Sequence, residues 1–310
     1  MSRPVSILAA PLYLGVDIGG TKIAIAVVTG SGIVLASERW PTRSGSAAAE
    51  AIAHLQERVQ AFCTAYSSII AIGVGICAQI DPSTGAISSA DTAIPGWRLY
   101  PLRDLLENLT HRPVAIDNDA RAALLGELWT GAAIGATDAL LLSIGTGVGA
   151  GIITSGCLVR GARGGAGEAG HIGILPSGPL CDCGNRGCLE TLVSGPALTL
   201  AAQRLGFPSP QALFAAAPLD WRARREVHRR GNYLSRALLT LVNLFQPAIV
   251  ILAGGVMGSA APWWLPQIRR AIQRHTFPSN RSVTILTATH HEQAGAIGAA
   301  ALARHRHGQS

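Results

Sequence analysis

Two segments of the chain, far apart in the sequence, follow the same pattern. Leu14–Val28 reads LGVDIGGTKIAIAVV, and Leu141–Thr154 reads LLSIGTGVGAGIIT. In each, an apolar run leads into a turn of glycine and threonine and a second apolar run follows, which predicts a β-hairpin with a glycine tip. The two segments lie about one domain length apart. We therefore expect a duplicated fold with one such hairpin in each half.

The rest of the chain alternates between strand-like and helical patterns, which is typical of an α/β protein. Strands are expected at 32–39, 70–76, 114–117, 248–253 and 283–287, and helices at 46–66, 102–108, 120–129, 195–205, 222–245, 262–274 and 294–305. With 310 residues, the chain is long enough for two domains.

A glycine-rich stretch from Gly164 to Glu190 gathers potential metal ligands. Three thiols and an imidazole can complete a tetrahedral zinc shell, and the intervening glycine, proline and asparagine residues let the backbone turn sharply enough to aim them. A CxC pair can also be a redox pair, and iron–sulfur clusters usually need four cysteines, so zinc is the expected metal. The expected ligands are His171, Cys181, Cys183 and Cys188.

Two carboxylates, Glu168 and Glu190, lie at either end of this cysteine and histidine cluster. A purely structural zinc site has no need of them, because its ligand shell is already closed. We therefore expect the segment to shape a polar site as well as a fold.

Both glycine turns are candidate phosphate sites. Asp17 to Lys22 (DIGGTK) lacks the order of a P-loop, and Gly145 to Gly149 (GTGVG) lacks the strand-then-helix context of a dinucleotide fingerprint. Glycine nevertheless lets backbone N–H groups approach phosphate oxygens, and a threonine hydroxyl adds a donor. Asp17 can hold the water shell of Mg²⁺. The plain alternative is an ordinary tight turn, but Gly254-Gly255 after a buried strand adds a third such place.

The segment Asp117-Asn118-Asp119 stands at a strand end, just before a predicted helix. One aspartate can cap the helix, which is the structural alternative. The other, beside an amide side chain, would suit a hydroxyl-positioning and proton-accepting pair. Phosphoryl transfer to an alcohol needs such a carboxylate, an in-line phosphate and a metal that offsets charge.

The composition excludes several classes of protein. No apolar run reaches the roughly 18 residues that a membrane span requires, and the N-terminus is too weak for a signal peptide. Clustered thiols without a disulfide framework favour a cytoplasmic location. The net charge of +7 and a pI near 9.5 would suit nucleic acid, but Lys22 is the one lysine and the arginines are mostly scattered. Nucleic-acid binding is therefore not expected.

Taken together, these motifs resemble the ROK family of sugar kinases, repressors and uncharacterised proteins. The resemblance covers nearly the whole chain, and its most specific part is the block that contains the cysteines. The matching motifs are DIGGTK at Asp17, DNDA at Asp117, IGTGVGAG at Ile144, GEAGH at Gly167, CDCGNRGCLE at Cys181, LAGGV at Leu252 and GAIGAA at Gly295.

The resemblance implies an α/β fold of the duplicated actin/hexokinase-like (ribonuclease H-like) type, with an interdomain cleft. The smaller domain is expected at residues 1–117, rejoined by a C-terminal helix at 294–310, and the larger domain, with the zinc loop, at 118–293. It also implies an ATP-dependent hexose kinase that phosphorylates the 6-hydroxyl, with glucose first and N-acetylmannosamine or another N-acetylhexosamine second. A homodimer or homotetramer is expected.

The resemblance further implies a role for each site residue. Asp119 would be the catalytic base with Asn118 beside it, and Asp17 would anchor Mg²⁺ through water. The sugar would contact Glu168, His171 and Glu190, and His171 would also hold zinc with Cys181, Cys183 and Cys188. The ATP phosphates would lie on Gly19, Gly20, Thr21, Lys22, Gly145, Thr146 and Gly147, and the adenosine near Gly254 and Gly255.

Two places depart from the usual glucokinase pattern. Cys77-Ala78 replaces a common Pro-Gly pair, and Thr92-Ala93 stands where an asparagine often precedes Pro-Gly-Trp. Both leave the choice of hexose open. A sugar-responsive repressor is set aside, because only about a dozen residues precede the first strand, too few for a DNA-binding domain. A catalytically silent sugar-binding protein remains a weaker alternative, because it would need neither the base nor the phosphate turns.

Overall fold

The fold is described by a computed structural model over residues 11–42, 48–81, 83–89, 94, 96–290 and 293–308. The chain divides into two compact units, residues 1–130 with 292–310 and residues 131–291. The break was expected after Asp117 but falls after Thr130, because α3 (Asp119–Thr130) packs on α9 (Ala294–His307). Glycine makes this packing close: a Cβ added at Gly298 of α9 would lie 2.5 Å from the Ala122 carbonyl oxygen of α3.

Within the described ranges, the first unit is built on a five-stranded sheet in the order β3-β2-β1-β4-β7. β1 pairs antiparallel with β2 and parallel with β4, which in turn pairs parallel with β7. The strands are β1 (Leu12–Ile18), β2 (Lys22–Thr29), β3 (Val34–Pro41), β4 (Ile69–Ile76) and β7 (Val114–Asn118), and the helices are α1 (Ala48–Ala65), α2 (Leu102–Thr110), α3 and α9. The predicted first hairpin is confirmed as β1–β2.

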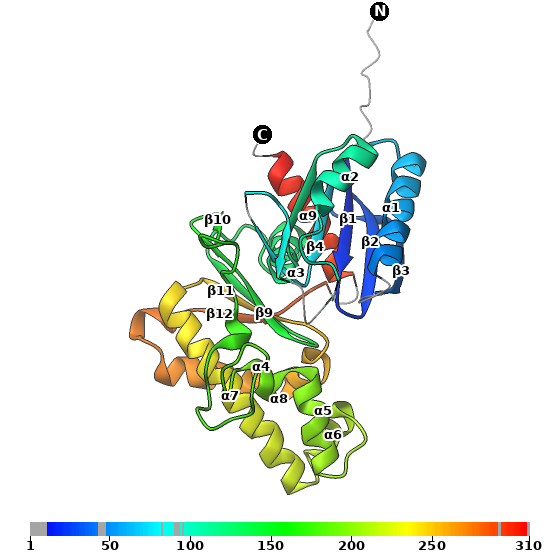
Figure 1. The fold of residues 1–310 in the computed structure, drawn as a ribbon. Coiled ribbons are helices and arrows are strands. Elements are labelled where there is room, and N and C mark those ends of the chain that lie inside the picture. The colour runs from blue at the N-terminus through cyan, green and yellow to red at the C-terminus, as the bar shows by residue number, and fades with distance from the viewer. Residues whose placement is uncertain are drawn as a thin grey trace, which may run out of the picture. The chain divides into compact units, whose positions relative to one another are not determined.

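This sheet is covered by helices on both faces, with α1 and α9 on opposite sides (Figure 1). Alternate apolar residues of β1 explain the arrangement, because Leu14 and Val16 face α1 and α2, whereas Tyr13 faces α9. On the α9 side the strands carry glycine: a Cβ at Gly15 would lie 1.9 Å from the Ala296 carbonyl oxygen, and one at Gly73 would lie 1.7 Å from that of Ala299. The last described helix can therefore lie directly on the backbones of β1 and β4.

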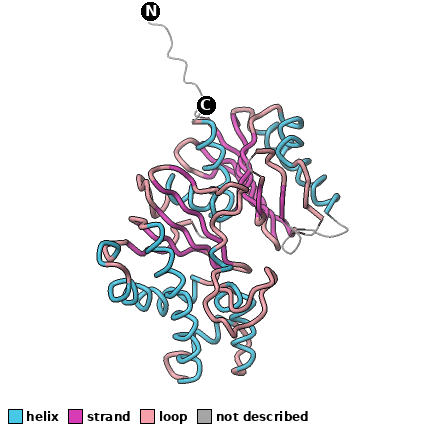
Figure 2. The backbone as a smooth tube through the Cα atoms, turned by 60° about the vertical axis from the view of Figure 1, so that its left-hand side comes forward, coloured by secondary structure: helices cyan, strands magenta, loops and turns pink. Residues whose placement is uncertain are grey.

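The second unit has a sheet of the same design, in the order β10-β9-β8-β11-β12 over the described residues. β8 pairs antiparallel with β9 and parallel with β11, so the predicted second hairpin is confirmed. Figure 2 shows both sheets in magenta. The strands are β8 (Ala139–Ile144), β9 (Val148–Thr154), β10 (Cys157–Leu158), β11 (Ile249–Ala253) and β12 (Thr284–Thr287), and the helices are α4 (Glu190–Val193), α5 (Gly195–Arg204), α6 (Pro210–Ala216), α7 (Trp221–Phe245) and α8 (Met257–His275).

The core of this unit lies between the sheet and helices α5 to α8, with Trp264 of α8 fully buried in it. The predicted helix at 262–274 was too short, because α8 begins at Met257 and holds Pro262 and Pro266 inside it. Burial of Met257, Ala260 and Trp264 outweighs the backbone hydrogen bonds that the prolines cannot donate.

Several short elements were not expected from the sequence. They are α4, α6, β10 and the two-stranded ladder of β5 (Gln79–Ile80) with β6 (Ile87–Ser89). Across the described part of the chain, helices are too short or too polar to cross a lipid bilayer.

Candidate functional site

The predicted site residues of the first unit gather at the carboxyl ends of parallel strands. The strand register aligns Asp17 of β1 with Gly75 of β4, and Gly75 with Asp117 of β7. Asn118 and Asp119 follow directly, at the junction of β7 and α3. Ligands of open α/β sheets bind at this edge, so the register itself builds a polar site.

The structure shows how the three residues Asp117 to Asp119 divide their contacts. The Ala120 N–H at the start of α3 donates to Asn118 Oδ1 (3.0 Å) and to Asp119 Oδ1 (2.8 Å). Asp117 accepts from the Asn118 N–H (2.8 Å) and pairs with Arg121, whose Nε lies 2.5 Å from its Oδ1. Both side chains of that pair are almost fully buried. The pair was not predicted from the sequence, because Asp117 lies in strand β7 and Arg121 in helix α3, so helical spacing does not connect them.

The turn after Asp17 is closed by its own backbone and by a threonine from β3's end. The Gly19 N–H donates to the Lys22 carbonyl (3.0 Å), and Thr42 Oγ1 donates to the Gly19 carbonyl (2.7 Å). Gly20, Thr21 and Lys22 are exposed at the tip. The tip therefore presents donors to solvent, as a phosphate site requires.

Asp17 sits in a setting that disfavours its charge. Burial, with a smaller contribution from Asp119 and an opposing one from Lys22, raises the pKa of Asp17 to about 7. Its carboxylate lies against the first turn of α9, where a Cβ added at Gly295 would be 2.0 Å from Oδ2. A cation nearby would restore the ionised form, so the carboxylate suits the Mg²⁺ role that was predicted for it.

In the second unit, the predicted glycine sites come together. The Gly145 N–H donates to the Gly147 carbonyl (2.9 Å), and the Gly145 carbonyl accepts from the Gly195 N–H (2.8 Å) at the start of α5. Gly254 has a left-handed φ of +92°, and a Cβ there would lie 2.3 Å from the Ile144 carbonyl oxygen. Only glycine fits that position, and it brings the Gly254-Gly255 turn against the base of the β8–β9 turn.

Glu190 is joined to the same turn. Its Oε2 accepts from the Val148 N–H at 2.7 Å, and a Cβ added at Gly147 would lie 2.7 Å from that oxygen. Glu190 was predicted to bind a sugar, and the turn was predicted to bind phosphates. The structure adds that the carboxylate rests on the turn, across 42 residues of sequence.

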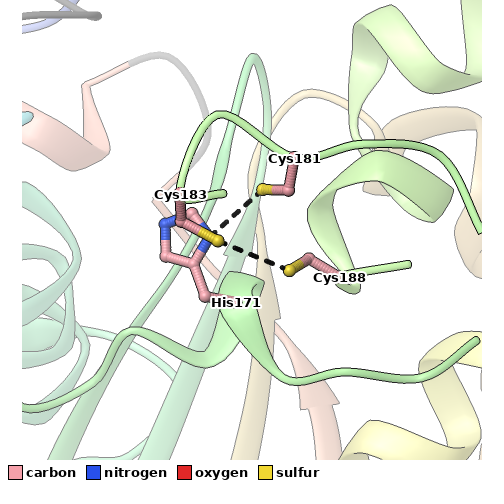
Figure 3. Close-up of side chains that lie close together, drawn as sticks. All are labelled: His171, Cys181, Cys183 and Cys188. Carbon is pink, nitrogen blue, oxygen red and sulfur yellow. Dashed lines mark hydrogen bonds between the residues drawn. The ribbon is translucent and has the colours of Figure 1, made fainter. Parts of the chain in front are cut away.

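The four predicted zinc ligands converge (Figure 3). Their donor atoms all lie within 4.8 Å of one another, with 3.5 Å between Cys181 Sγ and His171 Nδ1 and 3.7 Å between Cys183 Sγ and Cys188 Sγ. Tetrahedral zinc, with bonds of about 2.0 Å to nitrogen and 2.3 Å to sulfur, separates its ligands by roughly 3.5 to 3.8 Å. The spacing and the donor set therefore fit zinc.

The local backbone explains this convergence. Cys181 to Gly184 forms a tight turn in which the Gly184 N–H donates to the Cys181 carbonyl (2.9 Å), and the isolated bridge between Gly173 and Cys188 pairs the two ends of the loop. Burial and the neighbouring sulfurs raise the pKa of Cys188 to about 12. The Cys188 thiolate therefore needs a cation to offset its charge.

His171 and Glu168 are placed by a short 3-10 turn, Ala169–His171. A Cβ at Gly170 would lie 2.2 Å from the Val148 carbonyl oxygen, and one at Gly167 would lie 2.3 Å from that of Ala150, so this turn rests directly on β9. With Nδ1 of His171 in the cysteine cluster, Nε2 faces the Glu168 carboxylate at 3.8 Å. One imidazole can thus serve a metal and a second polar site.

The predicted site residues therefore form two groups, one in each unit. Asp17, the Gly19–Lys22 turn, Asn118 and Asp119 belong to the first. Glu168, Glu190, the zinc ligands and the remaining glycine turns belong to the second.

A comparison with known protein families matches the part of the chain that contains these motifs. Residues 13–306 match the ROK family. The chain belongs to the ROK family. It is 36% identical over 288 residues to a glucokinase of Halalkalibacterium halodurans, covering 86% of each chain, and 31% identical over 298 residues to an N-acetylmannosamine kinase of Escherichia fergusonii, covering 94% of this chain and 98% of that one.

A solved ROK family glucokinase from Streptomyces griseus, in complex with glucose and AMPPNP, superimposes with a TM-score of 0.75 at 32% identity. The match covers 95% of this chain and 99% of that one. The fold of this ROK protein is the duplicated actin/hexokinase-like fold, with one mixed five-stranded sheet in each unit among the residues described.

One of the two departures from the glucokinase pattern can be seen in the structure of this ROK protein. The Cys77 N–H donates to the Ile18 carbonyl (3.0 Å), and the Ala78 carbonyl accepts from Asn118 Nδ2 at 3.4 Å. Burial and the carboxylates of Asp119 and Asp17 raise the pKa of the Cys77 thiol to about 12. The Cys77-Ala78 pair thus touches the predicted base segment, whereas Thr92-Ala93 lies outside the described residues.

Proposed function

We propose that this ROK protein is an ATP-dependent hexose kinase that transfers the γ-phosphoryl group of ATP to the 6-hydroxyl of glucose. The observation that carries the proposal is the carboxylate edge of the first unit, where Asp17, Asn118 and Asp119 stand beside a glycine turn. The glucokinase relatives support it, since the resemblance to them spans nearly the whole chain.

In this reaction Asp119 is the general base. Its carboxylate accepts the proton of the sugar 6-hydroxyl while that oxygen forms a bond to the γ-phosphorus, and the bond from the γ-phosphorus to the bridging oxygen of ADP breaks. Asn118 holds the hydroxyl, and its own amide is oriented by the Ala78 carbonyl. The buried Asp117–Arg121 pair fixes the strand-to-helix junction that carries both residues.

The phosphates are held by backbone N–H groups of the two glycine turns, with Gly254-Gly255 near the adenosine. Mg²⁺ supplies positive charge to the transferring phosphate, and Asp17 would hold it through water. Near neutral pH a cation is what keeps Asp17 ionised, given its raised pKa.

The sugar hydroxyls are bound by Glu168, His171 and Glu190. Because Oε2 of Glu190 already accepts from Val148, its Oε1 is the oxygen for the sugar. A zinc ion on His171, Cys181, Cys183 and Cys188 would fix the loop that carries these groups, and its role is structural. We also propose a homodimer or homotetramer in the cytoplasm, where reduced thiols are kept available for zinc.

N-acetylmannosamine is the second candidate acceptor, because N-acetylmannosamine kinases are also among the relatives. Both reactions would use the same base and zinc loop. They differ in how the pocket accepts the substituent at carbon 2, and the Cys77-Ala78 departure from the glucokinase pattern, beside Asn118, bears on that pocket.

The test is a coupled ADP-release assay across glucose, mannose, N-acetylglucosamine, N-acetylmannosamine and fructose, with Asp119→Asn as the blank. Turnover that is highest with glucose and vanishes in the variant supports the proposal. Highest turnover with N-acetylmannosamine favours the second candidate. Absence of turnover on every sugar, in protein that holds zinc and binds ATP, refutes a hexose kinase.

A further inference from the structure

A buried ion pair in the second unit is not used by any step above. Arg230 and Glu226 lie one turn apart on α7 and are only 7% and 9% exposed. Arg230 Nε donates to Glu226 Oε1 at 2.7 Å, and the other oxygen, Oε2, pairs with the more exposed Arg229 at 2.5 Å. Burial of such charges is costly, and an apolar pair of similar volume would often be as stable, so the pair is not explained by stability alone.

The second contact of Arg230 reaches another element. Its Nη1 donates to the Leu192 carbonyl of α4 at 2.5 Å, so one guanidinium joins Glu226 of α7 to the last turn of α4. Carbonyls at the end of a helix lack partners within it, and a planar guanidinium can serve two acceptors in fixed directions. Arg230 thereby fixes α4 relative to α7.

The helix held in this way carries groups of the proposed site at both ends. α4 begins at Glu190, whose carboxylate accepts from the Val148 N–H. Just after α4, Ser194 caps α5, and the Gly195 N–H donates to the Gly145 carbonyl of the phosphate turn. A shift of α4 would move the sugar carboxylate and loosen its contact with the turn.

We propose that Arg230 is a positioning residue for Glu190. Arg230 acts through the Leu192 carbonyl. It keeps Glu190 Oε2 hydrogen-bonded to the Val148 N–H, so that Oε1 is directed toward the sugar. The role of Arg230 in sugar binding rests on the proposed function. The contacts that link Arg230 through α4 to the Val148 N–H are independent of that function.

The kinetic test compares Arg230→Lys with Arg229→Lys. A lysine at 230 keeps the charge beside Glu226, but its single nitrogen cannot reproduce both directions of the guanidinium. We expect the sugar KM to rise by about tenfold, because small displacements of a binding group are costly, with a much smaller rise in the ATP KM through the contact of Gly195 with Gly145. Arg229→Lys changes the same ion pair without touching Leu192, and its sugar KM should stay at the wild-type value.

Glu226→Gln is a second variant, which keeps an acceptor for Arg230 and removes the negative charge. It should leave the sugar KM close to that of the wild type. If Glu226→Gln and Arg229→Lys raise the sugar KM as much as Arg230→Lys does, or if Arg230→Lys raises the KM values of sugar and ATP by the same factor, the role is merely structural and the inference fails.

Hydrogen–deuterium exchange of the zinc-loaded protein without substrates tests the coupling apart from any activity. In Arg230→Lys the peptide that contains Val148 should exchange faster than in the wild type and in Arg229→Lys, with exchange in the first unit unchanged. Unchanged exchange at Val148 overturns the inference even in an active kinase. Faster exchange there in a protein that phosphorylates no hexose would support the coupling while the proposed function fails.

Discussion

The two glycine hairpins have the same backbone plan but are supported differently at their tips. In the first, the acid at the base of the turn is Asp17, which belongs to β1 itself. In the second, Ser143 occupies the corresponding place in β8, and the acid that touches the turn is Glu190, which comes from α4 and accepts from the Val148 N–H. The carboxylate at the first turn therefore belongs to the hairpin itself, whereas the carboxylate at the second turn comes from a helix outside the hairpin.

The two carboxylates also differ in environment. Asp17 is desolvated beside Asp119, so its pKa is raised, and a charged partner is needed to keep it ionised. Glu190 is half-buried, as Asp17 is, but its carboxylate accepts a hydrogen bond from the backbone N–H of Val148. Under the proposed function, the first unit supplies the base and the carboxylate for Mg²⁺, whereas the second unit supplies a phosphate turn and recognises the acceptor.

The strongest test of this division is Asp119→Asn in the first unit. Loss of a general base lowers kcat by about 10²- to 10⁴-fold, while the affinity for sugar should remain nearly unchanged. The coupled assay measures kcat, and calorimetry measures sugar binding. If the variant turns over as fast as the wild type, Asp119 is not the general base, and the first unit does not supply the base of the reaction.

Removal of zinc should affect the second unit selectively. The free energy of metal binding is part of the folding free energy of such a loop, so we expect Tm to fall by roughly 10 °C and sugar affinity to be lost. Cys188→Ser should have the same effect, whereas Cys157→Ser, at an exposed cysteine outside the cluster, should have none. Elemental analysis of the purified protein must find zinc, and a protein without it that is fully stable would contradict the assignment.

A smaller effect is expected from Gly147→Ala. The new Cβ would lie 2.7 Å from Glu190 Oε2, so the carboxylate has to move away from the Val148 N–H. We expect the sugar KM to rise about fivefold, since the displaced group is the flexible end of a side chain. Gly145→Ala is the matched control, because its Cβ would meet open space. If Gly147→Ala and Gly145→Ala have equal sugar KM values, Glu190 does not bind the sugar.

The smallest effect concerns the stability of the protein without Mg²⁺ or nucleotide. The pKa of Asp17 is raised from 3.8 to about 7 on folding, so between these pH values the folded state binds more protons than the unfolded state. Its contribution to the free energy of unfolding therefore falls as pH rises from 3.8 to about 7. Asp17→Asn should be more stable than the wild type above pH 7, with no such gain at pH 4. Urea unfolding at both pH values measures this, and an equal difference at each would show that Asp17 is not desolvated.

Local patterns in the sequence predicted the two hairpins and the convergence of His171 with the three cysteines well. The cysteines and His171 lie within one loop, and the hairpins are contiguous, so spacing alone carries their signal. The hydrogen bond from the Val148 N–H to Glu190 could not be predicted, because it depends on how α4 packs on β9. The early start of α8 was missed for a similar reason: two prolines argue against a helix locally, and only burial of Trp264 and its neighbours outweighs them.

The packing of α9 on β1 and β4 has a consequence for the order in which the protein forms. Residues 131–291 are contiguous and can complete their core as soon as they leave the ribosome. The first unit is synthesised earlier, but the face of its sheet that carries Gly15 and Gly73 is covered only in part, by α3, until α9 emerges. The half of the molecule that is translated first is therefore the half that finishes folding last, and its partly covered sheet is the surface that a nascent chain must protect from aggregation.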